Sequence, residues 1–361
     1  MAVSGPAPRA RMGGIVSTML DAARLVLESG SVAELRILNT RRGTVSGYFD
    51  DFDKLAAASA EWDGKASGIY VTLNPVNPDL LARSSNHLTE YAKHTTSDTD
   101  VPRRRWLPID CDPVRPAGIS STAEEHADAI GRAKEIGGWL RKQGWPQPVW
   151  ADSGNGGHIL YRIDLPNDSD STRLVQRCLE ALDLRFSDAA VTVDVTNYNA
   201  ARIWKLYGTT AAKGDSTADR PHRVSKVLFE PPNSETVDVA LLNRLADSVP
   251  QPDPKPRGGA DFDLERFIAD NLSVKRTGPW QQGSKWLLNP CPWNPDHTDN
   301  SAYIVQFATG AIAAGCHHNG CAGNDWAALR GLYEPEYEQR RNGPDRGADS
   351  ENAGSLAVKP E

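Results

Sequence analysis

Two periodicities of apolar residues run through residues 33–229. Some stretches alternate apolar and polar residues, as in a strand with one buried face. Others repeat apolar residues every three or four positions, as in an amphipathic helix. We predict strands at 33–38, 43–49, 68–73, 106–112, 148–151, 158–163, 191–195 and 224–229. Helices between these strands predict an α+β fold class.

One of these helices has recognisable ends. Ser121 or Thr122 stands three residues before Glu124 or Glu125, which is the pattern of a capping box at the start of a helix. Gly144 then ends the helical pattern. We therefore predict a helix that begins just after this Ser-Thr pair and stops before the glycine.

The length and local composition of the chain predict two domains. The 361 residues are too many for one small domain, and residues 248–260 are rich in Pro, Gly and charge, as in a linker. This linker would separate a domain at 15–247 from one at 261–337, with disordered ends at 1–14 and 338–361. No apolar run approaches about 20 residues and the start has no signal-peptide core, so we expect a cytoplasmic protein without membrane contact.

The charge and the cysteines refine this interpretation. A formal net charge of −7 argues against a surface that wraps nucleic acid everywhere, although the basic segments 103–105 and 202–226 could each be a solvated face or part of a channel. Cys178 belongs to the apolar stripe of a predicted helix and is expected in the core. The three C-terminal cysteines instead gather near histidines, which favours metal binding over disulfides.

Acidic residues occupy the polar face of a predicted strand in RRRWLPIDCDPVRP. Strand alternation places Leu107, Ile109 and Cys111 on one face and both Asp110 and Asp112 on the other. Two neighbouring carboxylates destabilise each other unless a cation neutralises them. The alternative is that this DCDP segment only ends a strand in a turn.

A third acid and a glycine-rich turn extend this pattern. In AVTVDVTNYN, alternation leaves Asp194 on the polar face of a second strand. Three acids from two strands can hold two Mg²⁺ or Mn²⁺ ions for an in-line displacement. In VWADSGNGGHILYRI, two strands flank a glycine-rich hairpin turn beside His158, a position suited to phosphate contacts or to a structural histidine.

The ordered combination of these motifs resembles the archaeo-eukaryotic primase superfamily, in particular the primase-polymerase domains of phage and plasmid replication proteins. This resemblance covers about 33–245. It implies an antiparallel sheet related to the RNA-recognition fold, with helices behind it and an N-terminal α/β module. It also implies catalytic roles for Asp110, Asp112, Asp194 (the metal ligands) and His158, and nucleotide binding by Ser153, Asn155, Gly156, Arg202 and Lys205.

The C-terminal cysteines and histidines predict a structural zinc site. Cys291 with His297 and Cys316 with Cys321 form two knuckles around a hairpin predicted at 303–307 and 311–314, as in a zinc ribbon. The region resembles zinc-binding modules of phage-type primases, but the knuckle spacings are wider than usual. His318 therefore stays an alternative fourth ligand.

Three functions follow as hypotheses. The first is a primase-polymerase that uses Mg²⁺ or Mn²⁺, structural Zn²⁺, a single-stranded DNA template and nucleoside triphosphates, with a replicative helicase as a candidate partner. The second is a non-catalytic nucleic-acid-binding replication initiation protein on the same fold. The third, a strand-nicking initiator, needs a His-x-His pair that no predicted strand contains. No GxxxxGK[ST] loop for ATP-driven helicase activity occurs in the sequence.

Overall fold

The computed structural model describes residues 18–250, 262–334 and 337. The ends predicted to be disordered, and residues 251–260 of the predicted linker, lie outside the described residues. The chain forms two compact units, Met1–Gln251 with Arg276–Lys285, and Pro252–Lys275 with Trp286–Glu361. No helix among the described residues is both long and apolar enough to cross a membrane.

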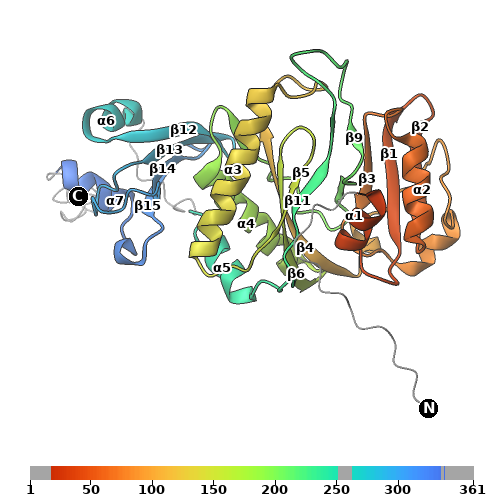
Figure 1. Cartoon of the computed structure of the whole chain (residues 1–361). Helices are drawn as coiled ribbons and strands as arrows, with labels where there is room; N and C mark the ends of the chain where they lie inside the picture. Colours follow the sequence, from red (N-terminus) through yellow and green to blue (C-terminus); the bar gives the residue numbers. More distant parts are fainter. Residues whose placement is uncertain (1–17, 251–261, 335–336, 338–361) are drawn as a thin grey trace, which may run out of the picture. The chain divides into compact units, whose positions relative to one another are not determined.

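The first unit is built around a five-stranded sheet of order β11-β5-β6-β4-β7, in which neighbouring strands are antiparallel (Figure 1). Helices α3 and α4 pack on this sheet and on each other. The chain order β4-α3-β5-β6-α4-β7 is a βαββαβ arrangement. These elements are β4 (Arg103–Pro113), α3 (Ala123–Lys142), β5 (Val149–Asp152), β6 (Gly157–Pro166), α4 (Ser169–Phe186), β7 (Val191–Val193) and β11 (Lys226–Phe229).

Local sequence signals explain the ends and faces of the two helices. Thr122 caps α3 by accepting a 3.1 Å hydrogen bond from the Glu125 backbone N–H, and the Glu125 carboxylate accepts one of 2.9 Å from the Thr122 backbone N–H. This is the predicted capping box. Of the two starts that the sequence allowed, the structure has the one at Thr122. In α4, Cys178 and its apolar stripe are buried in the core, as predicted.

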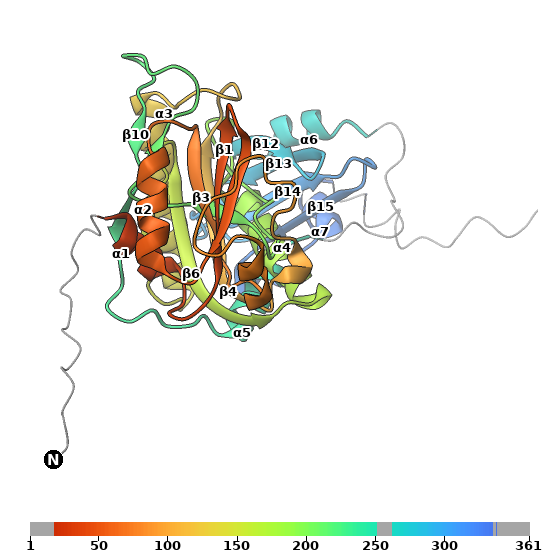
Figure 2. The ribbon, with the colours of Figure 1, turned by 90° about the vertical axis from the view of Figure 1, so that its right-hand side faces the viewer.

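A second sheet, of order β2-β1-β3-β8, carries α1 and α2 (Figure 2). Its apolar side chains, such as Leu35 and Ile37, share one core with Leu55 of α2 and with Trp106 and Leu160 of the five-stranded sheet. The elements are α1 (Met19–Val26), β1 (Ala33–Thr40), β2 (Gly43–Phe49), α2 (Phe52–Trp62), β3 (Gly68–Thr72) and β8 (Ile203–Lys205). Strand β8 follows β7 in the chain, so the segment between them leads from one sheet to the other.

Two predicted strands differ from the structure. The strand expected at 191–195 ends at Val193, because the Asp194 carboxylate accepts hydrogen bonds from the Thr196 backbone N–H and hydroxyl and starts a turn. The strand expected at 224–229 is divided, because buried Ser225 donates to the Thr209 carbonyl. The remaining elements of this unit are η1 (Pro78–Arg83), η2 (Asp98–Asp100), β9 (Thr210–Ala211), β10 (Arg223–Val224) and α5 (Val239–Asp247).

The second unit has a small core of its own, which includes Phe267, Ile304 and Leu329. The hairpin predicted from the sequence is found as β14 and β15, which pair antiparallel. The elements are α6 (Leu264–Asn271), β14 (Ala302–Gln306), β15 (Ile312–Cys316), η3 (Asn319–Cys321) and α7 (Trp326–Tyr333). Strands β12 (Val274–Trp280) and β13 (Gly283–Leu288) contain residues of both units.

Candidate functional site

Three polar residues stand side by side across adjacent strands of the five-stranded sheet. Asp110 on β4 is directly opposite His158 on β6 in the antiparallel register. On the other side of β4, the Asp194 backbone N–H donates a 2.9 Å hydrogen bond to the Asp110 carbonyl, just beyond the end of β7. Leu107 and Ile109 point away into the core. The sheet therefore brings together residues that are far apart in the sequence.

A cavity of about 390 Å³ lies at this row of residues. Residues from the second sheet also line the cavity. They include Tyr70 on β3 and Lys205 on β8, which lie opposite each other in the antiparallel pairing of these strands. The polar residues that line the cavity are Ser67, Tyr70, Asp110, Asp112, Ser153, Asn155, His158, Asp194, Asn197, Arg202, Lys205 and Lys213. The structure thus collects in one cavity the acids, the histidine and most of the nucleotide-binding candidates predicted from the sequence.

Gly156 is not part of this lining and has a packing role in the hairpin turn. A Cβ at Gly156 would lie 2.3 Å from the Cys111 carbonyl oxygen, so only glycine allows the turn to approach β4 this closely. Ser153 organises the same turn, since its hydroxyl accepts a 2.8 Å hydrogen bond from the Gly156 N–H. The Asn155 side chain accepts a 2.9 Å hydrogen bond from the Ser121 N–H and so ties the turn to the start of α3.

The two acids on β4 have opposite pKa shifts. The pKa of Asp112 is raised to about 6, first by the negative charge of Asp110 and then by burial. Burial also raises the pKa of Asp110, but the neighbouring His158, Lys213 and Arg202 outweigh it and hold the net pKa below the usual value. The pair therefore carries one firmly ionised carboxylate and one that gains a proton in mildly acidic solution.

Asp194 is already paired with a cation. Its Oδ2 lies 2.9 Å from a guanidinium nitrogen of Arg202, and its Oδ1 accepts from Thr196. The ligand atoms of the three acids do not converge as those of a metal site do. Among the described residues, such convergence is found at a Cys/His cluster of the second unit, where the ligand atoms all lie within 4.8 Å of one another. A three-carboxylate metal site at Asp194 would require this ion pair to open.

Two lysines also line the cavity. Lys205 is buried, and its Nζ donates a 2.8 Å hydrogen bond to the Thr210 carbonyl. Burial lowers the pKa of Lys205 to about 7, against the attraction of Asp63. Lys213 lines the same cavity. Lys213 belongs to the basic segment 202–226 noted in the sequence, whereas Tyr70 was omitted from our prediction of the site, although the alternation in strand 68–73 would have identified it as a polar-face residue.

The arginines of the basic segments 103–105 and 202–226 have structural partners. Arg104 is buried and donates to the Tyr198 carbonyl and to Thr172, while Arg103 and Arg105 pair with Asp164. Within 202–226, Arg220 makes two 2.8 Å hydrogen bonds to Glu125, and Arg223 donates to the Ser121 carbonyl. Arg220 and Arg223 therefore fasten their loop to the start of α3.

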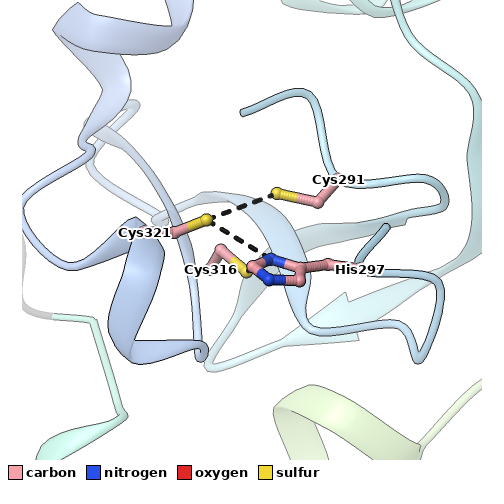
Figure 3. Close-up of side chains that lie close together, drawn as sticks. All are labelled: Cys291, His297, Cys316 and Cys321. Atoms are coloured by element: carbon pink, nitrogen blue, oxygen red, sulfur yellow. Dashed lines mark hydrogen bonds between the residues drawn. The ribbon is translucent and has the colours of Figure 1, made fainter. Parts of the chain in front are cut away.

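A separate cluster lies in the second unit. Ligand atoms of Cys291, His297, Cys316 and Cys321 all lie within 4.8 Å of one another (Figure 3). The Cys291 and Cys321 sulfurs are 3.9 Å apart, and His297 Nδ1 lies 3.4 Å from Cys321 Sγ and 3.8 Å from Cys316 Sγ. A tetrahedral zinc site with Zn–S bonds of about 2.3 Å and Zn–N bonds of about 2.0 Å separates its ligand atoms by about 3.5 to 3.8 Å.

The cluster could therefore bind a structural zinc ion through three thiolates and one imidazole. The ring of His318 stacks on that of His297 with centroids 3.7 Å apart, and the Asn294 amide contacts His297 Nε2 at 3.1 Å. Such contacts hold a ligating ring in place. His297 is the histidine whose ligand atom converges with all three thiols within 4.8 Å, while His318 Nδ1 lies 3.5 Å from Cys316 Sγ alone.

Comparison with known proteins leaves the family open. No protein-family model matches the chain, and no curated protein does. A crystal structure of primase RepB' is similar to it with a TM-score of 0.35 and 10% sequence identity over 63% of this chain. The chain spans 62% of that structure's own length, less than two thirds. At this level of similarity, a functional assignment depends on the chemistry of the two sites themselves.

Proposed function

We propose that the first unit is a DNA-templated nucleotidyltransferase, a primase-polymerase that synthesises primers or short strands on single-stranded DNA. The observation that carries this proposal is the cavity in which Asp110, Asp112 and Asp194 face Arg202 and Lys205. Carboxylates suit divalent cations, and the basic residues suit a triphosphate. The βαββαβ order of the sheet agrees with an RNA-recognition-like fold, as expected for a primase-polymerase.

The carboxylates fit Mg²⁺ or Mn²⁺ in two respects. Asp110 Oδ1 is buried and makes no hydrogen bond of good geometry among the described residues, although His158 Nε2 lies 3.3 Å from it. The raised pKa of Asp112 shows that the two charges repel each other. Asp110 and Asp112 would hold the cations, and Asp194 would join them after release from Arg202. Bound Mg²⁺ or Mn²⁺ would lower the charge repulsion and stabilise the pyrophosphate leaving group.

The reaction forms one bond and breaks one bond. The 3′-hydroxyl oxygen of the growing strand attacks the α-phosphorus of a nucleoside triphosphate and loses its proton, and pyrophosphate leaves. Arg202 and Lys205 would hold the triphosphate, which keeps the Lys205 ammonium charged although burial lowers its pKa to about 7. His158 would donate a hydrogen bond to a phosphate oxygen. These side chains position the reactants in line, which accounts for much of catalysis in phosphoryl transfer.

The second unit would contribute template binding. A zinc-stabilised module that holds single-stranded DNA or the initiating nucleotide would complement the cavity. A replicative helicase is the partner we would look for. The alternative is a nucleic-acid-binding replication initiation protein without catalysis, and the ion pair between Asp194 and Arg202 favours it, because this pair occupies the third acid.

Primer synthesis tests the proposal. The full-length chain is incubated with single-stranded DNA, Mn²⁺ or Mg²⁺ and labelled ribo- or deoxyribonucleoside triphosphates, and products are separated by length. We expect oligonucleotides from the wild type and none from an Asp110→Ala, Asp112→Ala double variant. Asp128→Asn, a change of an exposed acid on α3, is the matched control and should stay active. DNA binding without synthesis or primer extension would favour the alternative.

A further inference from the structure

A buried chain of hydrogen bonds leads from the core to His158. The Trp204 indole Nε1–H donates a 2.7 Å hydrogen bond to the Tyr207 hydroxyl oxygen, and that oxygen lies 3.0 Å from His158 Nδ1. On the cavity side, His158 Nε2 lies 3.3 Å from Asp110 Oδ1. Trp204, Tyr207 and His158 are all at most 4% exposed. Water therefore has little access to these groups.

The direction of the central hydrogen bond follows from the donors available. Indole nitrogen is only a donor, so Trp204 must fill an acceptor position on the Tyr207 oxygen. The Tyr207 hydroxyl keeps its hydrogen, since burial raises its pKa. A buried hydroxyl hydrogen requires an acceptor, and His158 Nδ1 is the acceptor at 3.0 Å. An imidazole that accepts a hydrogen bond at Nδ1 carries its proton on Nε2.

This tautomer suits what lies beyond the ring. Nε2 faces the Asp110 carboxylate, and in the proposed function it also faces a triphosphate; both offer only acceptor oxygens. A lone pair on Nε2 would be repelled by them, whereas an N–H can donate. The ring is also held in place by Trp204, whose ring centroid lies 4.0 Å from that of His158. Tyr207 therefore fixes the tautomer of His158, and Trp204 helps to fix the orientation of its ring.

We infer that Tyr207, supported by Trp204, is a positioning residue that fixes His158 with its proton on Nε2, ready to donate to a phosphate oxygen of the incoming nucleotide. The consequence for nucleotide binding rests on the proposed function, but the tautomer does not. Neither Trp204 nor Tyr207 acts on substrate directly in this arrangement. The assignment combines residues from β6 and β8 and from the turn after β8.

Nuclear magnetic resonance on the full-length chain tests the tautomer without any activity. Two-bond proton–nitrogen correlations of protein labelled with ¹⁵N-histidine show which ring nitrogen carries the proton, and the His158 signals are identified by their loss in His158→Gln. We expect the Nε2–H form in the wild type at neutral pH. A wild type with its proton on Nδ1 alone would overturn the inference, whatever the enzyme assay shows.

Variants then connect the tautomer to binding. Tyr207→Phe removes only the hydroxyl and should give a mixture of His158 tautomers and raise the KM for nucleotide about tenfold, with a smaller change in kcat. Trp204→Phe should shift both readouts in the same direction but less. The matched control is Tyr161→Phe, on the same strand as His158, because the Tyr161 hydroxyl is buried without a hydrogen-bond partner within the described structure.

The outcomes separate the two proposals. Tautomer mixing together with a raised KM in Tyr207→Phe, and neither effect in Tyr161→Phe, supports the positioning role. An unchanged His158 tautomer in a folded Tyr207→Phe refutes it. If the wild type makes no strands at all, the nucleotidyltransferase proposal fails, while the tautomer spectra of the wild type and of Tyr207→Phe still decide whether Tyr207 orients His158.

Discussion

The cavity of the first unit and the Cys/His cluster of the second differ in how complete they are. At the cluster, the ligand atoms of Cys291, His297, Cys316 and Cys321 already converge within 4.8 Å. At the cavity, Asp110 and Asp112 share one strand face, but Asp194 is paired with Arg202. The Cys/His cluster already has a geometry that a tetrahedral metal ion could use, whereas the three acids would need the ion pair to open before they could bind cations together.

The difference follows from the charge of the ligands. Neutral thiols and a neutral imidazole can gather in a small apolar core without repulsion, and a metal then displaces their protons. Carboxylates are charged before the metal arrives, so they must be held by cations such as Arg202 or suffer a raised pKa, as Asp112 does. A structural site can therefore be preformed, whereas an acidic catalytic site is expected to be completed by its cations and substrate.

The largest expected effect is the loss of a zinc ligand. His297→Ala should abolish zinc binding and unfold the second unit, since structural zinc contributes on the order of 10 kcal/mol to such modules. Zinc content measured by atomic absorption, with hydrogen exchange followed in peptides of each unit, reports both effects. His318→Ala is the matched control and should keep the metal. Zinc loss in His318→Ala but not in His297→Ala would reverse the choice of ligand.

The next largest effect is expected at Asp194, the third acid of the cavity, which is paired with Arg202. Asp194→Asn should lower kcat for nucleotide incorporation by about a hundredfold or more, because it removes a charge that the cations would need. Arg202→Gln should mainly raise the KM for nucleotide, since it removes a triphosphate contact while it frees Asp194. Steady-state kinetics with varied Mn²⁺ separates the two. Equal and small effects of both changes would show that the pair is only structural.

A smaller effect is the pH dependence caused by Asp112. Its folded-state pKa of about 6 lies above the unfolded value of about 4, so the folded chain binds more protons in this window and its free energy of unfolding falls as pH rises from about 4 to 6. Its side chain is 37% exposed, so solvent screening reduces the effect to about 1 kcal/mol. In urea unfolding with zinc retained but without Mg²⁺ or Mn²⁺, the free energy of unfolding of the wild type should fall relative to that of Asp112→Asn over this pH range. Parallel stability curves would contradict it.

The smallest effect is expected outside both sites. Arg220→Gln removes two hydrogen bonds to Glu125 and should lower the free energy of unfolding only slightly, because solvent screens this pair, without a change in nucleotide KM. A double-variant cycle with Glu125→Gln measures the coupling. A raised KM for nucleotide in Arg220→Gln would instead indicate that Arg220 contacts the phosphates of the nucleotide.

Much of the secondary structure, and many of the residues that gather at the two sites, could be predicted from the sequence alone. Alternation in 106–112 placed Asp110 and Asp112 on one face, and the capping box located the start of α3. The spacing of cysteines and histidines predicted a metal cluster. These features depend on residues close together in the chain, where the periods of strands and helices are strict.

Only the tertiary structure decided which distant residues meet. Strand order placed His158 and Asp194 on either side of Asp110, and the step of β8 into the second sheet brought Lys205 and Tyr70 to the same cavity. It also showed that Arg220 pairs with Glu125, and that the ligand atom of His297 converges with those of the three cysteines, which sequence spacing could not establish. Contacts across strands depend on register and on the packing of separate elements, which local sequence periodicity does not determine.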